Sequence, residues 1–62
     1  MKAFEVIGRR REERGIPVAE LARRVDMPYE SLRVALDGNR RITADELVEL
    51  CTELGLELKD FA

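Results

Sequence analysis

Two short apolar stripes on either side of a proline constrain this chain more than any other feature. The first stripe falls at helical spacing within residues 18–25 and the second within residues 28–37. Their members are Val18, Leu21, Ala22 and Val25, followed by Leu32, Ala35 and Leu36. Pro28 cannot continue the first helix, because its ring removes a donor and clashes one turn back, but it suits the start of a second. The pattern predicts a helix, a sharp turn and another helix.

The turn is expected at Asp26-Met27-Pro28. Aspartate tolerates the left-handed backbone conformation better than most non-glycine residues, so we expect Asp26 to end the first helix. Met27 would then be buried between the two helices. Two helices joined by so short a turn meet at a wide angle, which is the geometry of a helix-turn-helix.

The rest of the chain is also predicted to be helical. Helices are expected over residues 2–14, 17–25 and 28–37, with a fourth that begins after Thr43 and stops at Gly55. Thr43 followed three residues later by Glu46 is the capping-box pattern. We therefore predict an all-α fold, a compact bundle of four to five short helices with a central helix-turn-helix, in one domain over residues 1–62.

Length and composition exclude several classes of protein. A core built from 62 residues supplies only ~3–5 kcal/mol of net stability. Cys51 has no partner cysteine, which favours a small core residue and a reducing, cytoplasmic setting. No apolar run approaches the ~18 residues of a membrane span, and the N-terminus does not resemble a signal peptide. We expect no cofactor, metal, membrane or small-molecule substrate. No enzyme is expected, since the chain lacks histidine, a glycine-rich phosphate loop and paired carboxylates in an identifiable pocket.

The charges are polarised along the chain, although the net charge is only −2. Residues 1–24 hold seven basic and four acidic side chains, whereas residues 43–62 hold one basic and six acidic side chains. Such an oriented distribution can still steer a DNA ligand to one face of an acidic protein.

The segment LARRVDMPYESLRVALDGNRRI resembles the helix-turn-helix of phage repressors and Cro proteins. Ala22 matches the small residue where the helices of that family cross, and Gly38 matches the glycine after the recognition helix. The resemblance extends roughly from Ile7 to Phe61 and implies a lambda repressor-like DNA-binding domain. The chain departs from the family at Val18, where glutamine often contacts a phosphate.

The resemblance implies base contacts from the outward side of the second motif helix, at Tyr29, Glu30, Arg33 and Val34. Arg33 could donate two hydrogen bonds to guanine. Glu30 could accept from cytosine or hold Arg33 through an i, i+3 pair. Val34 could contact a thymine methyl, and Tyr29 could stack or bind a phosphate.

Phosphate contacts are expected from residues near both ends of that helix and from the first helix. The residues are Arg11, Ser31, Asn39, Arg40 and Arg41. Family members often place an arginine at Arg11, although an ion pair with Glu12 or Glu13 is an alternative use of this side chain. Contacts of this kind would position the protein without reading sequence.

The expected function is transcriptional repression by operator occupancy. Two copies would bind an inverted repeat in double-stranded DNA as a homodimer, which could form only on DNA. Leu56, Leu58 and Phe61 would either close the core or form the surface between the copies. Two alternatives remain open: a protein-interaction module that has lost DNA binding, favoured by the acidity and by Val18, and an antitoxin with an added protein partner.

Overall fold

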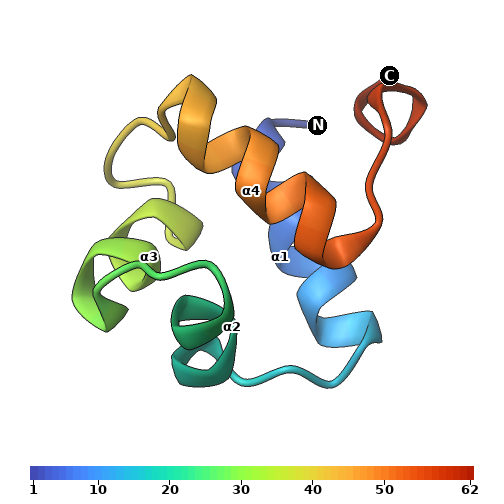
Figure 1. Cartoon of the computed structure of the whole chain (residues 1–62). Coiled ribbons are helices and arrows are strands. Elements are labelled where there is room, and N and C mark those ends of the chain that lie inside the picture. Colours follow the sequence, from blue (N-terminus) through green and yellow to red (C-terminus); the bar gives the residue numbers. More distant parts are fainter.

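A computed structural model describes residues 1–62 as four α-helices and a final 3-10 turn (Figure 1). The elements are α1 (Ala3–Glu13), α2 (Val18–Arg24), α3 (Tyr29–Leu36), α4 (Ala44–Leu54) and η1 (Leu58–Phe61). α1 packs against α3, α4 and η1, while α2 packs against α3. The all-α prediction is confirmed, and none of the helices is long and apolar enough to cross a membrane.

All four helices contribute to one apolar core. Its largest fully buried side chains are Ile7, Leu21, Leu32, Leu50 and Leu54. No polar or charged residue is buried with them. Both predicted stripes face this core, although their outer members Val18 and Leu36 are only partly buried. Complete burial of one such side chain contributes about 1.5–3 kcal/mol, so these five residues hold the helices together.

The turn between α2 and α3 follows the prediction closely. Asp26 has the left-handed φ of 56°, and the Met27 amide donates to the Ala22 carbonyl at 2.9 Å. Met27 packs against the core but stays partly exposed. Pro28 is the cap residue before α3 rather than its first residue, with φ −60° and ψ 138°. The proline therefore sets the direction in which α3 leaves the turn.

The loop after α3 is pressed against α1. Gly38 has φ +79°, and a Cβ atom there would lie 2.6 Å from Cζ of Phe4. Only glycine combines this backbone conformation with so close an approach to an aromatic ring. The contact fixes where residues 39–42 leave α3.

The predicted capping box begins α4. The Glu46 amide donates to the Thr43 hydroxyl at 3.1 Å, and the Thr43 amide donates to the Glu46 carboxylate at 3.0 Å. Beyond α4 the three C-terminal apolar residues differ in burial. Leu56 is 8% exposed and belongs to the core, which is the first of the two roles expected for this residue. Leu58 is 92% exposed, and Phe61 is partly buried against the core.

Candidate nucleic-acid interface

The side of α3 opposite the core carries the four residues expected to read bases. Leu32 and Ala35 are completely buried, whereas Tyr29 and Glu30 are exposed and Arg33 and Val34 are partly exposed. The helix thus presents an aromatic ring, a carboxylate, a guanidinium and a small apolar side chain. The carboxylate, the guanidinium and the small apolar side chain offer the acceptor, donor and methyl contacts by which base edges in the major groove are read.

Arg33 is held between two carboxylates of its own helix region. Its Nε donates to Glu30 at 3.3 Å, its Nη1 donates to Asp37 at 3.1 Å, and its Nη2 also donates to Glu30. These bonds use three of the five guanidinium N–H groups and leave one on each terminal nitrogen. The pairing of Glu30 with Arg33 is the second of the two uses expected for Glu30.

The same pairing shapes the electrostatics of α3. Hydrogen bonding from Arg33 lowers the pKa of the Glu30 carboxyl below its ordinary value, and Glu30 in turn raises the pKa of Arg33. Both groups therefore stay charged through the neutral pH range. Because Glu30 and Asp37 flank one arginine, the helix itself carries no excess of positive charge that would attract DNA.

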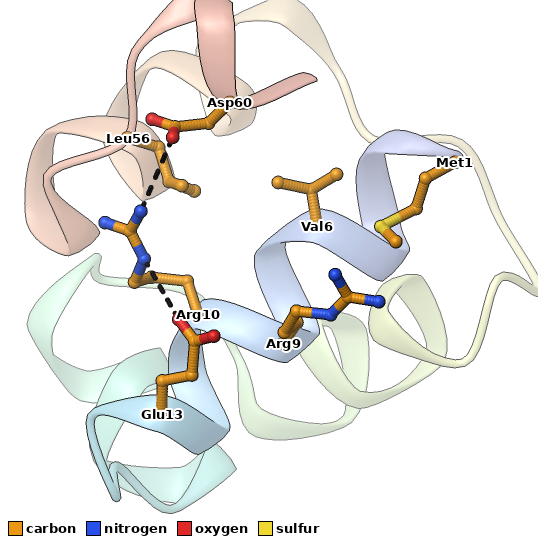
Figure 2. A pocket seen from close by; sticks show the side chains of 7 residues that line it. All are labelled: Met1, Val6, Arg9, Arg10, Glu13, Leu56 and Asp60. Atoms are coloured by element: carbon orange, nitrogen blue, oxygen red, sulfur yellow. Dashed lines mark ion pairs between the residues drawn. The ribbon is translucent and has the colours of Figure 1, made fainter. Parts of the chain in front are cut away.

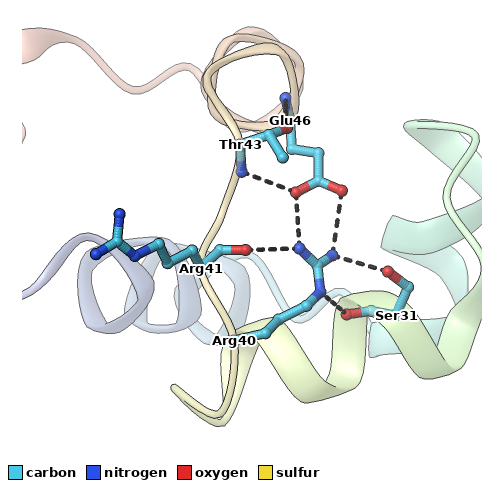
Figure 3. A network of polar contacts seen from close by, with 5 residues as sticks. All are labelled: Ser31, Arg40, Arg41, Thr43 and Glu46. Carbon is cyan, nitrogen blue, oxygen red and sulfur yellow. Dashed lines mark hydrogen bonds and ion pairs between the residues drawn. The ribbon is translucent and has the colours of Figure 1, made fainter.

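Arg40 is partly buried, and its guanidinium is bonded within the chain (Figure 3). Its guanidinium donates to both carboxylate oxygens of Glu46, at 2.9 and 3.1 Å. It also donates to the Ser31 carbonyl at 3.1 Å, to the Ser31 hydroxyl at 2.8 Å and to the Arg41 carbonyl at 2.7 Å. These five bonds use every N–H group that a guanidinium has. A phosphate could bind Arg40 only by displacing one of these hydrogen bonds, which argues against the phosphate contact expected for Arg40.

The other residues expected near phosphates remain accessible to different degrees. Asn39 and Arg41 are exposed, and the Arg41 side chain points away from the Arg40 network (Figure 3). Arg41 makes no ion pair, in contrast to Arg40. Ser31 is partly buried and uses its hydroxyl oxygen as an acceptor, so the hydroxyl proton is still available for donation.

Arg11 points toward the loop before α2. Its Nη1 donates to the Ile16 carbonyl at 2.7 Å, and its Nε is buried without a partner in the chain. No ion pair joins it to Glu12 or Glu13, and the Ile16 contact takes the place of that alternative. The side chain therefore stabilises the turn between α1 and α2, with part of its guanidinium uncommitted.

Most of the remaining arginines pair with acidic side chains. Arg23 and Arg24 both bond Glu20, and Arg24 also reaches Glu53 at 3.4 Å. These bonds hold the pKa of the Glu20 carboxyl below its ordinary value, chiefly through Arg23. Together with Arg10, three of the seven basic side chains of residues 1–24 thus pair with carboxylates in the folded chain.

Arg10 ties α1 to the end of α4. Its Nη1 donates to the Leu54 and Gly55 carbonyls at 3.1 and 3.3 Å, and its guanidinium pairs with Glu13 and Asp60 (Figure 2). A cation at the C-terminus of a helix interacts favourably with the helix dipole. The small pocket beside it, about 160 Å³, is below the range of ~300–1,000 Å³ typical of small-molecule sites.

A larger apolar groove of about 530 Å³ runs between α4 and the C-terminal segment. It is lined mainly by Leu47, Val48, Cys51, Leu56, Leu58 and Phe61. Burial raises the pKa of the Cys51 thiol, which keeps it protonated at neutral pH. No three acidic or cysteine side chains gather as metal ligands would.

The roles of Asp37 and Glu46 in holding arginine side chains in place were not predicted from the sequence. Asp37 holds Arg33, and the i, i+4 spacing between them could have indicated this pair. Glu46 was predicted only as part of a capping box, whereas its carboxylate also holds Arg40 across a loop. No local spacing rule connects residues 40 and 46.

Comparison with known proteins points to a single family. The family model of the Cro/C1-type HTH DNA-binding domain matches residues 7–62. This span agrees with the resemblance found in the sequence from Ile7 to Phe61. Searches of curated proteins and of solved structures gave no match.

Proposed function

Since the chain belongs to the Cro/C1-type helix-turn-helix DNA-binding domain family, we propose that it recognises a specific double-stranded DNA sequence and represses transcription by occupying it. The observation that carries this proposal is the exposed side of α3. Tyr29, Glu30, Arg33 and Val34 lie together there, over a core that fixes the helix in place. The protein would act in the cytoplasm as a regulator rather than as an enzyme.

Arg33 is the residue we assign to guanine. Glu30 and Asp37 restrict the guanidinium, and the two N–H groups left free lie on its two terminal nitrogens. A bidentate contact to guanine O6 and N7 needs two such donors, and each good bidentate pair contributes ~1–3 kcal/mol of discrimination. A side chain already held in place also loses less conformational entropy when it binds.

Contacts to the DNA backbone would come mainly from the loop after α3. Arg41 and Asn39 are exposed there, next to the reading helix, and Arg41 has no acidic partner. We assign Arg41 the main electrostatic contact with a phosphate and Asn39 a neutral one. Arg11 stays a further proposed contact through the part of its guanidinium that Ile16 does not occupy.

One recognition helix contacts only a few base pairs, so we propose that two copies bind an inverted repeat. Half-sites one helical turn apart, ~34 Å, would place both α3 helices in successive major grooves. Leu58 and Phe61 are the residues proposed for contact between the copies, beside the exposed Val48 in the α4 groove. The six acidic side chains of residues 43–62 would repel a second copy in free solution. Pairing is therefore expected chiefly on DNA.

Selection of binding sites from random DNA tests this function directly. Wild type is expected to enrich an inverted repeat, and Arg33→Ala to lose the preference at one base pair per half-site. Arg9→Ala is the matched control, because Arg9 is exposed and unpaired but lies on α1, where its side chain points toward Met1 (Figure 2). A wild-type selection without any enriched sequence contradicts specific recognition, and one without an inverted repeat contradicts the paired arrangement.

The second candidate function is a protein-interaction module, including the antitoxin variant. It is favoured by the excess of acidic residues in the C-terminal third and by the exposed apolar groove of α4. Affinity for DNA measured against salt concentration separates the two functions. A DNA-binding protein loses affinity steeply as salt rises, whereas an interaction module shows little affinity at any salt concentration.

A further inference from the structure

We propose that Arg40 and Glu46 form a positioning pair that directs the Ser31 hydroxyl of the reading helix toward a DNA phosphate. The proposal rests on the DNA-binding function proposed above and assigns Arg40 a role different from that of its neighbour Arg41. Arg41 would attract the phosphate backbone by charge. Arg40 would touch no DNA and would act through Ser31.

The pair is built as a fixed bridge between two helices. Arg40 bonds the carbonyl and the hydroxyl of Ser31 on α3, and both carboxylate oxygens of Glu46 on α4 (Figure 3). The side chains of Arg40 and Glu46 are 26% and 24% exposed, so solvent screens the pair less than it screens a surface ion pair. Two-pronged pairing between guanidinium and carboxylate also fixes the geometry of both groups.

Glu46 is restricted in turn by the start of its own helix. One of its oxygens accepts the Thr43 amide at 3.0 Å and also an Arg40 N–H at 2.9 Å. The hydrogen bond from Arg40 is the largest cause that lowers the pKa of the Glu46 carboxyl. Since the carboxylate cancels the charge of Arg40, the bridge offers little net attraction for DNA.

The consequence for Ser31 follows from the chemistry of a hydroxyl group. A serine oxygen accepts through its lone pairs and donates through a single proton. Because a lone pair of Ser31 faces Nη2 of Arg40 at 2.8 Å, the proton must point elsewhere. Ser31 is the third residue of α3, in the first turn of a helix, where a nearby anion is favoured. A phosphate at this position would accept the proton and fix the register of α3 on the duplex.

The test uses wild type, Ser31→Ala, Arg40→Ala, the double variant and Arg41→Ala, all on the DNA duplex that wild type selects from random sequence. Ser31→Ala is expected to weaken binding about tenfold, as for loss of a hydrogen bond to a charged group. Arg40→Ala is expected to weaken binding by a similar factor, with the double variant no weaker than either single variant. Arg41→Ala should lower the salt slope by about 0.9 for each bound copy, whereas Arg40→Ala should leave it unchanged.

A second measurement locates the contact. Replacing single phosphates of the duplex by neutral methylphosphonates should find one position at which wild type loses affinity and Ser31→Ala loses none. Arg40→Ala should lose part of this sensitivity to the neutral phosphate. A variant that is only less stable would keep the full sensitivity under conditions in which it is folded. Circular dichroism establishes that each variant is folded at the assay temperature. If Arg40→Ala unfolds, Arg40→Ala combined with Glu46→Gln removes the unpaired charge and takes its place.

Different outcomes overturn different claims. Equal reductions of the salt slope in Arg40→Ala and Arg41→Ala would make Arg40 an ordinary phosphate contact and refute the positioning role. Additive losses in the double variant, or no phosphate that depends on Ser31, would refute it as well. If wild type binds no duplex with salt-dependent affinity, the DNA-binding function itself fails.

Discussion

Three glycine-to-alanine substitutions should change stability in three different ways, because the backbone and surroundings of these glycines differ. Gly8 lies inside α1, and a Cβ atom added there would meet nothing within 4 Å, so Ala there should stabilise the fold by about 0.5–1 kcal/mol. Gly15 has φ +65° and also open space, so Ala there should cost about 1–2 kcal/mol from backbone strain.

Gly38 combines strain with a steric overlap. Its φ is +79°, and a Cβ atom would approach three ring carbons of Phe4 to 2.6–2.9 Å. Strain of about 1–2 kcal/mol and overpacking of about 1–3 kcal/mol together predict a loss of about 2–5 kcal/mol. The domain has only ~3–5 kcal/mol of net stability, so Gly38→Ala should leave much of the protein unfolded.

Urea unfolding followed by circular dichroism at 25 °C measures these differences. Phe4→Leu combined with Gly38→Ala should lose less than the sum of the single changes, because the smaller side chain relieves the overlap. If Gly38→Ala loses no more than Gly15→Ala, the Phe4 ring moves aside and the close packing contributes nothing. If Gly8→Ala is destabilising, the assumption of open space around that position is wrong.

The remaining predictions concern the core, the dependence of stability on acidic pH and base recognition. Leu32→Ala should lower the free energy of unfolding by ~2–5 kcal/mol in urea titrations, because Leu32 is completely buried at the centre of α3. Because Arg40 lowers the pKa of Glu46 below 4.5, that pairing contributes stability above pH 4.5 that is lost as the pH falls through the lower folded-state value. The stability difference between wild type and Glu46→Gln should therefore shrink in acid, and a constant difference would argue against the pairing. Arg33→Ala should cost ~1–3 kcal/mol of affinity per half-site on the selected duplex, and equal affinity would remove Arg33 from base recognition.

Local patterns in the sequence were sufficient for the helices and their ends. The two stripes, the left-handed Asp26 and the capping box at Thr43 all depend on residues within about one helical turn of each other. Such features are set by backbone sterics and by neighbouring hydrogen bonds, and each was confirmed. The predicted boundaries of α1, α2 and α3 included one flanking cap residue at each end, because caps share the composition of helix termini.

The uses of the charged side chains were decided only by the tertiary structure. Arg40 and Arg41 are adjacent and chemically identical, yet Arg40 uses all five donors inside the chain and Arg41 makes no ion pair. Leu56 and Leu58 likewise belong to one apolar segment, but one closes the core and the other is exposed. A residue's partners across a loop depend on how the helices pack, which brings together groups that no sequence spacing relates. For this reason the sequence predicts that α3 faces DNA, while the fold determines which arginines are left without partners inside the chain.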